Sequence, residues 1–108
     1  MRNPFGNPKE LQRMMDQAMK GMEQAKEQVK QIQVEASAGG GVVKATVNGE
    51  GEVLALHIDP MVVDPTDTEM LEDLVLSAIR EARTQAMGRA SEVMNSIPGL
   101  PNVGGLLG

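Results

Sequence analysis

The spacing of apolar residues changes twice along this chain, and that change constrains its fold more than any other feature. From about Pro8 to Ile32, apolar side chains recur every three or four residues, which is the spacing of one helix face. From there to Ile58 they alternate with other residues, as in a strand with one buried face. The helical spacing returns from about Asp67 to Asn95. The predicted order is therefore helix, strands, helix.

Turn-forming residues divide the alternating region into three strands. A run of glycines at 39–41 separates the first two, and Asn48-Gly49, a strong hairpin signal, precedes the third. We expect the strands at residues 32–38, 43–47 and 53–58. Connections this short allow only antiparallel neighbours in the order 1-2-3. The predicted fold class is α+β, with the order α-β-β-β-α: two long helices packed on one face of a three-stranded antiparallel meander.

The ends of both helices carry recognisable signals. Pro8 suits a first helical turn, with Asn7 as its N-cap. Thr66 and Glu69 have the T-x-x-E spacing of a capping box at the start of the second helix. A first helix of about 25 residues would be roughly 38 Å long, so part of it should project beyond the sheet. The two helices should run antiparallel.

The chain is long enough for one domain and too short for two. Residues 8–96 are expected to form that domain. Residues 1–7 are expected to be a flexible N-terminal tail. Residues 97–108, which are rich in proline and glycine, are expected to be a flexible C-terminal tail.

Composition excludes several classes of protein. The chain has no cysteine, which rules out disulfides and thiol catalysis and is typical of a reducing, cytoplasmic compartment. The first 30 residues are charged throughout, unlike a signal peptide, and no apolar run approaches the roughly 20 residues of a membrane span. Phe5 is the only aromatic residue, so the core depends on aliphatic side chains and nine methionines, which suit helix or subunit contacts.

Charge is unevenly distributed along the chain. The net charge is −5, which argues against a general polyanion binder. Residues 45–79, however, hold eight acidic and no basic side chains, whereas residues 1–34 hold six basic and four acidic ones. The middle of the chain is therefore strongly acidic, and its two ends are mildly basic.

No motif for catalysis or for a cofactor emerges. The glycines at 39–41 lack the Gly-Lys-Ser/Thr ending of a phosphate loop and read as a turn. His57 is the only histidine, so we do not expect a zinc site. We expect His57 to lie on a strand face or at an interface. The acidic residues around the start of the second helix are explained by their favourable interaction with the positive end of the helix dipole. We expect no enzyme, no cofactor, no metal site and no small-molecule substrate.

The basic residues are more informative. Lys9, Arg13 and Lys20 fall within about 40° of one another, opposite the apolar stripe of the first helix. On the second helix Arg80 and Arg83 lie off the stripe, and antiparallel packing is expected to bring Arg83 and Arg89 close to the first set. A solvated, salt-bridged face with an Asp16–Lys20 pair explains the first set equally well.

Several strings resemble the YbaB/EbfC nucleoid-associated family over about residues 8–95. No single string is diagnostic, but the ordered set is specific. The strings are Met14-Met15-Asp16-Gln17-Ala18-Met19, Gly39-Gly40-Gly41-Val42-Val43-Lys44, Val47-Asn48-Gly49, Ile58-Asp59-Pro60 and Asp67-Thr68-Glu69-Met70-Leu71-Glu72-Asp73-Leu74.

The resemblance implies a tweezer-shaped homodimer whose helical arms project from a central body. It implies a cytoplasmic, nucleoid-associated protein that binds double-stranded DNA, alters its conformation and contributes to nucleoid organisation and gene regulation. The family's DNA contacts lie on the two helices that flank the sheet. Carried onto this chain by position, they imply a DNA-binding set of Lys9, Arg13, Lys20, Arg80, Arg83 and Arg89.

A second hypothesis is a protein-interaction or assembly module that does not bind DNA. Methionine-lined helix stripes can dock a partner helix, and an acidic body would suit a basic partner. The near absence of aromatic residues bears on the first hypothesis instead. Without aromatic rings to stack on bases, any nucleic-acid binding should depend on phosphates and duplex shape.

Overall fold

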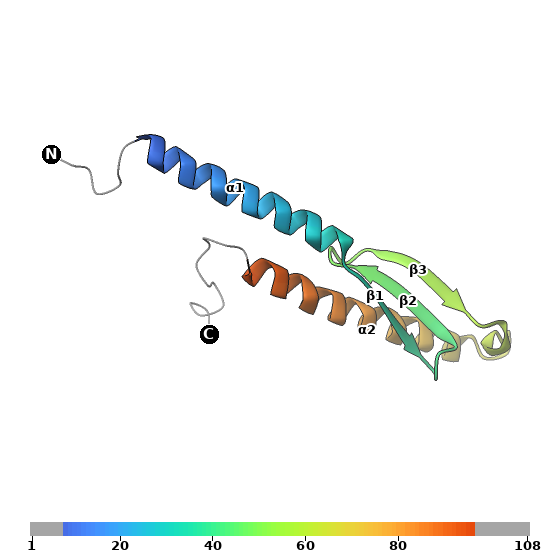
Figure 1. Ribbon diagram of the computed structural model, residues 1–108. Coiled ribbons are helices and arrows are strands. Elements are labelled where there is room, and N and C mark those ends of the chain that lie inside the picture. Colours follow the sequence, from blue (N-terminus) through green and yellow to red (C-terminus); the bar gives the residue numbers. More distant parts are fainter. Residues whose placement is uncertain (1–7, 97–108) are drawn as a thin grey trace.

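The computed structural model describes residues 8–96, and it has the expected order of elements (Figure 1). The expected tails and the Asn7 cap lie outside these residues. The elements are α1 (Pro8–Gln31), β1 (Gln33–Ala38), β2 (Val43–Asn48), β3 (Val53–Ile58), the short 3-10 helix η1 (Pro60–Val62) and α2 (Thr68–Asn95). Only η1 has no counterpart in the sequence-based prediction. It begins where the Asp59 side chain accepts a hydrogen bond from the Met61 amide.

The three strands form an antiparallel sheet in the order β1-β2-β3, as predicted. Alternation places Val43, Ala45 and Val47 of β2 on one face, where all three are fully buried. Lys44, between them, points to the opposite face and is exposed. The sheet therefore has one apolar face and one polar face, which is why the alternating sequence pattern was informative.

The turn between β2 and β3 is organised by Asn48, which is 6% exposed. Its side-chain oxygen accepts hydrogen bonds of 2.9 Å from the amides of Glu50 and Glu52. Gly51, whose φ is +87°, completes the turn with a backbone bond to the Asn48 carbonyl. The predicted hairpin is thus confirmed, but its loop is longer than a two-residue turn.

Helix α2 covers the apolar face over β1 and β2. Its contact side is a row of alanines spaced four apart, Ala78, Ala82 and Ala86, each with no exposed surface. Such small side chains let the helix axis lie close to the strands, and valines of the sheet fill the space between. The core of this protein is therefore thin and aliphatic.

The start of α2 differs from the predicted capping box. Asp67 is the N-cap, and its carboxylate accepts a hydrogen bond of 3.3 Å from the Met70 amide. Thr66 belongs to the turn before the helix, where its amide and its hydroxyl both donate hydrogen bonds to the Asp64 carboxylate. The prediction of Thr66 as the cap was wrong because an aspartate stood on each side of it, and each is a good cap or turn residue in its own right.

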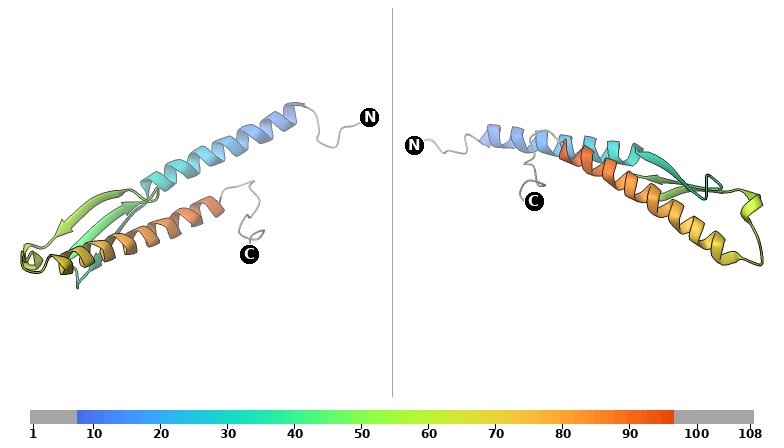
Figure 2. Two further views of the ribbon diagram at one scale, coloured as in Figure 1. Left: turned by 180° about the vertical axis from the view of Figure 1, so that it is seen from behind. Right: turned by 90° about the horizontal axis from the view of Figure 1, so that it is seen from below.

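Helix α1 leaves the sheet and projects as an arm (Figures 1 and 2). It packs on the C-terminal part of α2 and on the end of β2, and Ala25 is its only residue described as buried. The two helices run antiparallel, and α1 continues past the end of α2 (Figure 2). The expectation that part of the first helix projects is confirmed. Of the two helices, α2 provides the cover for the sheet.

Candidate nucleic-acid interface

The outer side of α1 carries the first set of basic residues. Lys9, Arg13 and Lys20 are all exposed and lie on the side of the helix opposite Ala25, which faces α2. Three cations therefore share one solvent-facing stripe along the projecting half of the arm. Acidic Asp16 and Glu23 share this side of the helix and moderate its potential.

The second set lies on α2 and is more dispersed. Arg80, Arg83 and Arg89 are all exposed, but Arg83 also makes a hydrogen bond within the fold. Its guanidinium donates a hydrogen bond of 3.3 Å to the carbonyl oxygen of Gly51 in the turn between β2 and β3. Arg83 therefore ties the middle of α2 to the end of the sheet.

The expected convergence of the two sets does not occur. The last turns of α2, at Met94 and Asn95, lie beside Lys26 of α1, with which they line one groove. Lys9 is 17 residues before Lys26, which is roughly 25 Å along the helix. The prediction that Arg83 and Arg89 lie close to Lys9, Arg13 and Lys20 was wrong, because α2 ends beside Lys26, toward the C-terminal end of α1, and not at the tip of the arm.

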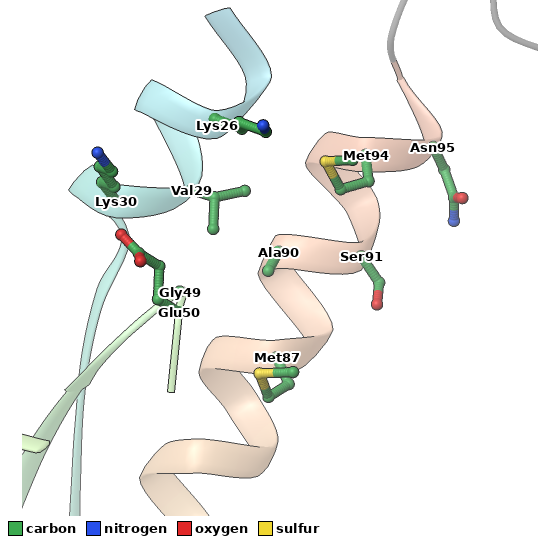
Figure 3. A pocket seen from close by; sticks show the side chains of 10 residues that line it. All are labelled: Lys26, Val29, Lys30, Gly49, Glu50, Met87, Ala90, Ser91, Met94 and Asn95. Carbon is green, nitrogen blue, oxygen red and sulfur yellow. The ribbon is translucent and has the colours of Figure 1, made fainter. Parts of the chain in front are cut away.

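Two cations that the sequence reasoning missed lie at the base of the arm. Lys26 and Lys30, one helical turn apart on α1, line the groove between α1 and α2 (Figure 3). Glu50, from the turn between β2 and β3, lines it from the sheet side. The i,i+4 spacing of Lys26 and Lys30 is visible in the sequence, but the position of these two lysines opposite α2 depends on how the two helices pack.

A cluster of acidic residues lies at the opposite end of the molecule from the arm tip. The 3-10 helix and the start of α2 form that end in Figure 1, and residues 59–73, which include them and their flanking residues, carry six of the eight acids of residues 45–79. One of these, Asp64, has its pKa held below the ordinary value of 3.8 by the hydroxyl and then the amide of Thr66. This end of the protein is therefore acidic, whereas the arm carries charges of both signs.

The described residues offer little for other chemistry. Within residues 8–96, no group of three or more histidine, cysteine, aspartate or glutamate side chains is arranged to hold a metal ion. No helix in that part of the chain is both long and apolar enough to span a membrane. His57 lies on the exposed polar face of the sheet, paired with Lys44. The fold and this surface define a small α+β protein whose charged groups are displayed on open, projecting helices.

Comparison with known proteins gives this class a family. The model of the YbaB/EbfC DNA-binding family matches residues 5–100. A nucleoid-associated protein of Nocardia farcinica is 44% identical over 105 residues, covering 89% of this chain and 96% of its own. One of Anaeromyxobacter sp. is also 44% identical, covering 92% and 99%. The chain belongs to the YbaB/EbfC DNA-binding family.

A solved structure supports the fold independently. An uncharacterised protein of Helicobacter pylori, HP0035, superposes with a TM-score of 0.72. The match covers 86% of this chain and 98% of that one at 24% sequence identity. At that identity the likeness concerns the fold alone. It extends the α-β-β-β-α arrangement to a protein of very different sequence.

Proposed function

We propose that this protein binds double-stranded DNA through phosphate contacts made mainly by α1. The observation that carries the proposal is the exposed stripe of Lys9, Arg13 and Lys20 on a projecting helix, remote from the acidic end of the molecule. Cations placed this way can approach a phosphate backbone while the acidic cluster at the other end of the molecule stays away from it. Membership of a family described as DNA-binding supports the same conclusion. Arg80, Arg83 and Arg89 are proposed as secondary contacts on α2.

The side chains available favour recognition of the backbone over recognition of bases. The strands carry no aromatic residue, so the protein lacks the stacking surface that single-strand and many RNA binders use. Lysine and arginine on an exposed helix can contact phosphate oxygens, which position a protein on a duplex without reading its sequence. We therefore expect weak sequence preference and a strong dependence of affinity on salt.

We also propose that the active form is a homodimer joined through β3 and the adjacent side of α2. Leu56 pairs with Ala45 in the sheet, so it points to the face that carries α2. Helix α2 packs on β1 and β2, however, and leaves Leu54 and Leu56 46% and 44% exposed. Leu76 of α2 is also exposed, at 47%. A second copy would cover this apolar face and present two arms.

Two arms on one rigid body would hold the duplex at two places and so alter its conformation. The named relatives are nucleoid-associated proteins, which supports the same location for this one within the cytoplasm. We propose that it contributes there to nucleoid organisation and, through the DNA that it reshapes, to gene regulation. A protein acting this way requires no catalytic group, cofactor or small-molecule substrate.

The experiment is an electrophoretic mobility shift with a short random-sequence duplex, repeated over a salt series. The wild-type protein should shift the duplex at micromolar concentrations of the dimer. Arg13→Glu removes one phosphate contact from each arm, so the slope of log affinity against log salt should become shallower by about two. Lys44→Glu makes the same change of charge on the polar face of the sheet and should leave the slope unchanged.

Two results would contradict the proposal. A wild-type protein that leaves the duplex unshifted at low salt would exclude DNA binding at useful affinity. Equal losses in Arg13→Glu and Lys44→Glu would show that only the net charge matters, and not the stripe on α1.

A further inference from the structure

The groove between α1 and α2 is apolar at its centre and open to solvent. It has a volume of about 550 Å³, and Val29 of α1 faces Met87, Ala90 and Met94 of α2 across it (Figure 3). Met87 and Met94 are 49% and 40% exposed, although they lie between two helices. A groove of this size and composition is suited to a short apolar segment.

The apolar lining continues along α1 beyond the groove. At about 100° per residue, Met15, Met19 and Met22 fall on the same side of α1 as Lys26. Their exposed fractions are 59%, 59% and 40%. Methionine side chains adapt to ligands of irregular shape, so this strip forms one continuous, adaptable apolar surface.

The chain itself supplies a segment of matching chemistry. Helix α2 ends at Asn95, which lines the groove, so the residues that follow start at its edge. Segment 97–107 has no charged residue, and a Pro98-Gly99 pair near its start favours a reversal of direction. It carries five aliphatic side chains, namely Ile97, Leu100, Val103, Leu106 and Leu107.

We propose that segment 97–107 folds back and lies in this groove within its own chain. Eleven residues reach up to roughly 36 Å when extended. The groove runs from Met87 to Asn95, which is only roughly 12 Å along α2. A tethered segment is also present at an effective concentration in the millimolar range, which free partners seldom match. Phosphate is a poorer occupant because the centre is apolar and Glu50 lies at the edge.

Occupation of the groove would join the two helices of the arm. The buried residues of this part of the two helices are small, Ala25 of α1 and Ala90 of α2, so little buried area fixes the angle between the helices. Aliphatic side chains inserted between Val29 and Met94 would add that area. The segment would thereby set the angle between α1 and α2, and Lys26 and Lys30 would remain at the solvent edge.

Paramagnetic broadening tests the proposal on the full-length protein. The chain has no cysteine, so Val103→Cys gives a single site for a nitroxide label. With ¹³C-methyl methionine, the methyl signals of Met87 and Met94 should broaden strongly and recover when the nitroxide is reduced. Met61 and Met70 lie at the other end of the molecule and serve as internal controls that should stay sharp.

A mixed sample separates the two sources of the segment. Here the nitroxide is on unlabelled protein and the ¹³C-methyl groups are on untagged protein. The proposal expects little broadening of Met87 and Met94 in this sample. Broadening equal to that of the singly tagged protein would assign the groove to a second copy's segment and overturn the proposal. Sharp Met87 and Met94 signals in both samples would overturn it as well.

A substitution within the segment provides the second variant. Leu100→Asp places a charge where an apolar contact is proposed, and it leaves the described core around Ala82 unchanged. In the Val103→Cys background it should largely abolish the broadening while the fold, followed by circular dichroism, is retained. Unchanged broadening at Met87 and Met94 would contradict insertion of the segment into the groove.

Discussion

Gly49 lies where the turn between β2 and β3 touches the base of α1. Its amide donates a hydrogen bond of 3.2 Å to the Ile32 carbonyl. A Cβ atom at this position would lie 2.2 Å from the carbonyl oxygen of Val29. Gly49 is absent from the residues with positive φ, so glycine is required here for the close approach and not for its backbone angles. This single residue therefore sets how α1 leaves the sheet.

Gly49→Ala should destabilise the protein by roughly 1–3 kcal/mol, since either α1 or the turn must move to relieve the contact. Gly88→Ala is the matched control. A Cβ at Gly88 meets nothing within 4 Å, and alanine in a helix interior is favoured over glycine by about 1 kcal/mol. The two variants should therefore shift the midpoint of urea unfolding in opposite directions. A neutral Gly49→Ala would show that the base of α1 adapts freely.

At Thr66, one hydroxyl controls the ionisation of a neighbouring carboxylate. The hydroxyl oxygen of Thr66 lies 2.7 Å from Oδ1 of Asp64. The amide nitrogen of Thr66 lies 2.9 Å from the same Oδ1 atom. Thr66→Val removes the hydroxyl, the larger cause of the lowered pKa, and should raise the pKa of Asp64 toward 3.8. Thr66→Ser should keep it low. The measurement is an NMR titration of the Asp64 carboxyl carbon, and equal values in both variants would contradict this assignment.

The sign of this effect fixes its pH range. Because the folded-state pKa of Asp64 is lowered, the interaction stabilises the protein above the pKa of the unfolded chain. It is lost as the pH falls from about that value through the folded pKa. Thr66→Val should therefore differ from the wild type in stability near neutral pH and converge with it in strong acid.

At the scale of elements, α2 depends on small side chains where it crosses the sheet. Ala82 has no exposed surface and lies in the core with Ala45 and Val47. Ala82→Leu inserts a large side chain into this thin layer and should cost roughly 1–3 kcal/mol by overpacking. Thr84→Leu, on the exposed side of the same helix, should be nearly neutral. Thermal unfolding of both variants checks this, and equal melting temperatures would mean that α2 packs loosely.

The elements themselves were largely predictable from the sequence, because each has one buried face. Val43, Ala45 and Val47 are fully buried while Lys44 between them is exposed, so the period of two was real in space. The third strand has the predicted bounds, 53–58. The start of α2 was misread at Thr66, because Asp67 supplies the N-cap and Thr66 is hydrogen-bonded to Asp64 instead.

The candidate site was less predictable, because it depends on how far along each other the helices lie. Helical spacing was sufficient to place Lys9, Arg13 and Lys20 on one side of α1. It could not show that α2 ends beside Lys26, since that depends on the close contact at Gly49 and on the cap at Asp67. For the same reason, the sequence could not show that Lys26 and Lys30 line the groove between the helices.

At the scale of the whole molecule, three surfaces with different chemistry lie on one elongated body. The arm displays cations, the end formed by η1 and the start of α2 displays acids, and β3 displays leucines. A single chain leaves Leu54 and Leu56 partly exposed on the apolar face of its sheet. Exposed apolar patches of this kind mark interaction sites, which supports the proposed dimer.

Leu56→Glu should therefore convert the proposed dimer into a folded monomer, because it places a charge within the proposed interface. The variant should keep its circular dichroism spectrum, since Leu56 is already 44% exposed in the single chain. His57→Glu is the matched control, one residue away on the opposite face of the sheet. Analytical ultracentrifugation should give half the wild-type mass for Leu56→Glu and the full mass for His57→Glu.

The two variants also connect assembly to DNA binding. A monomer has one arm, so Leu56→Glu should halve the salt slope of duplex binding and weaken its affinity by about 100-fold or more, as expected when two linked contacts become one. His57→Glu should bind like the wild type. A Leu56→Glu protein that still sediments as a dimer would place the interface elsewhere than β3. A monomer that retains full affinity and slope would instead show that a single arm carries the DNA contact, and the two-armed mechanism would be wrong.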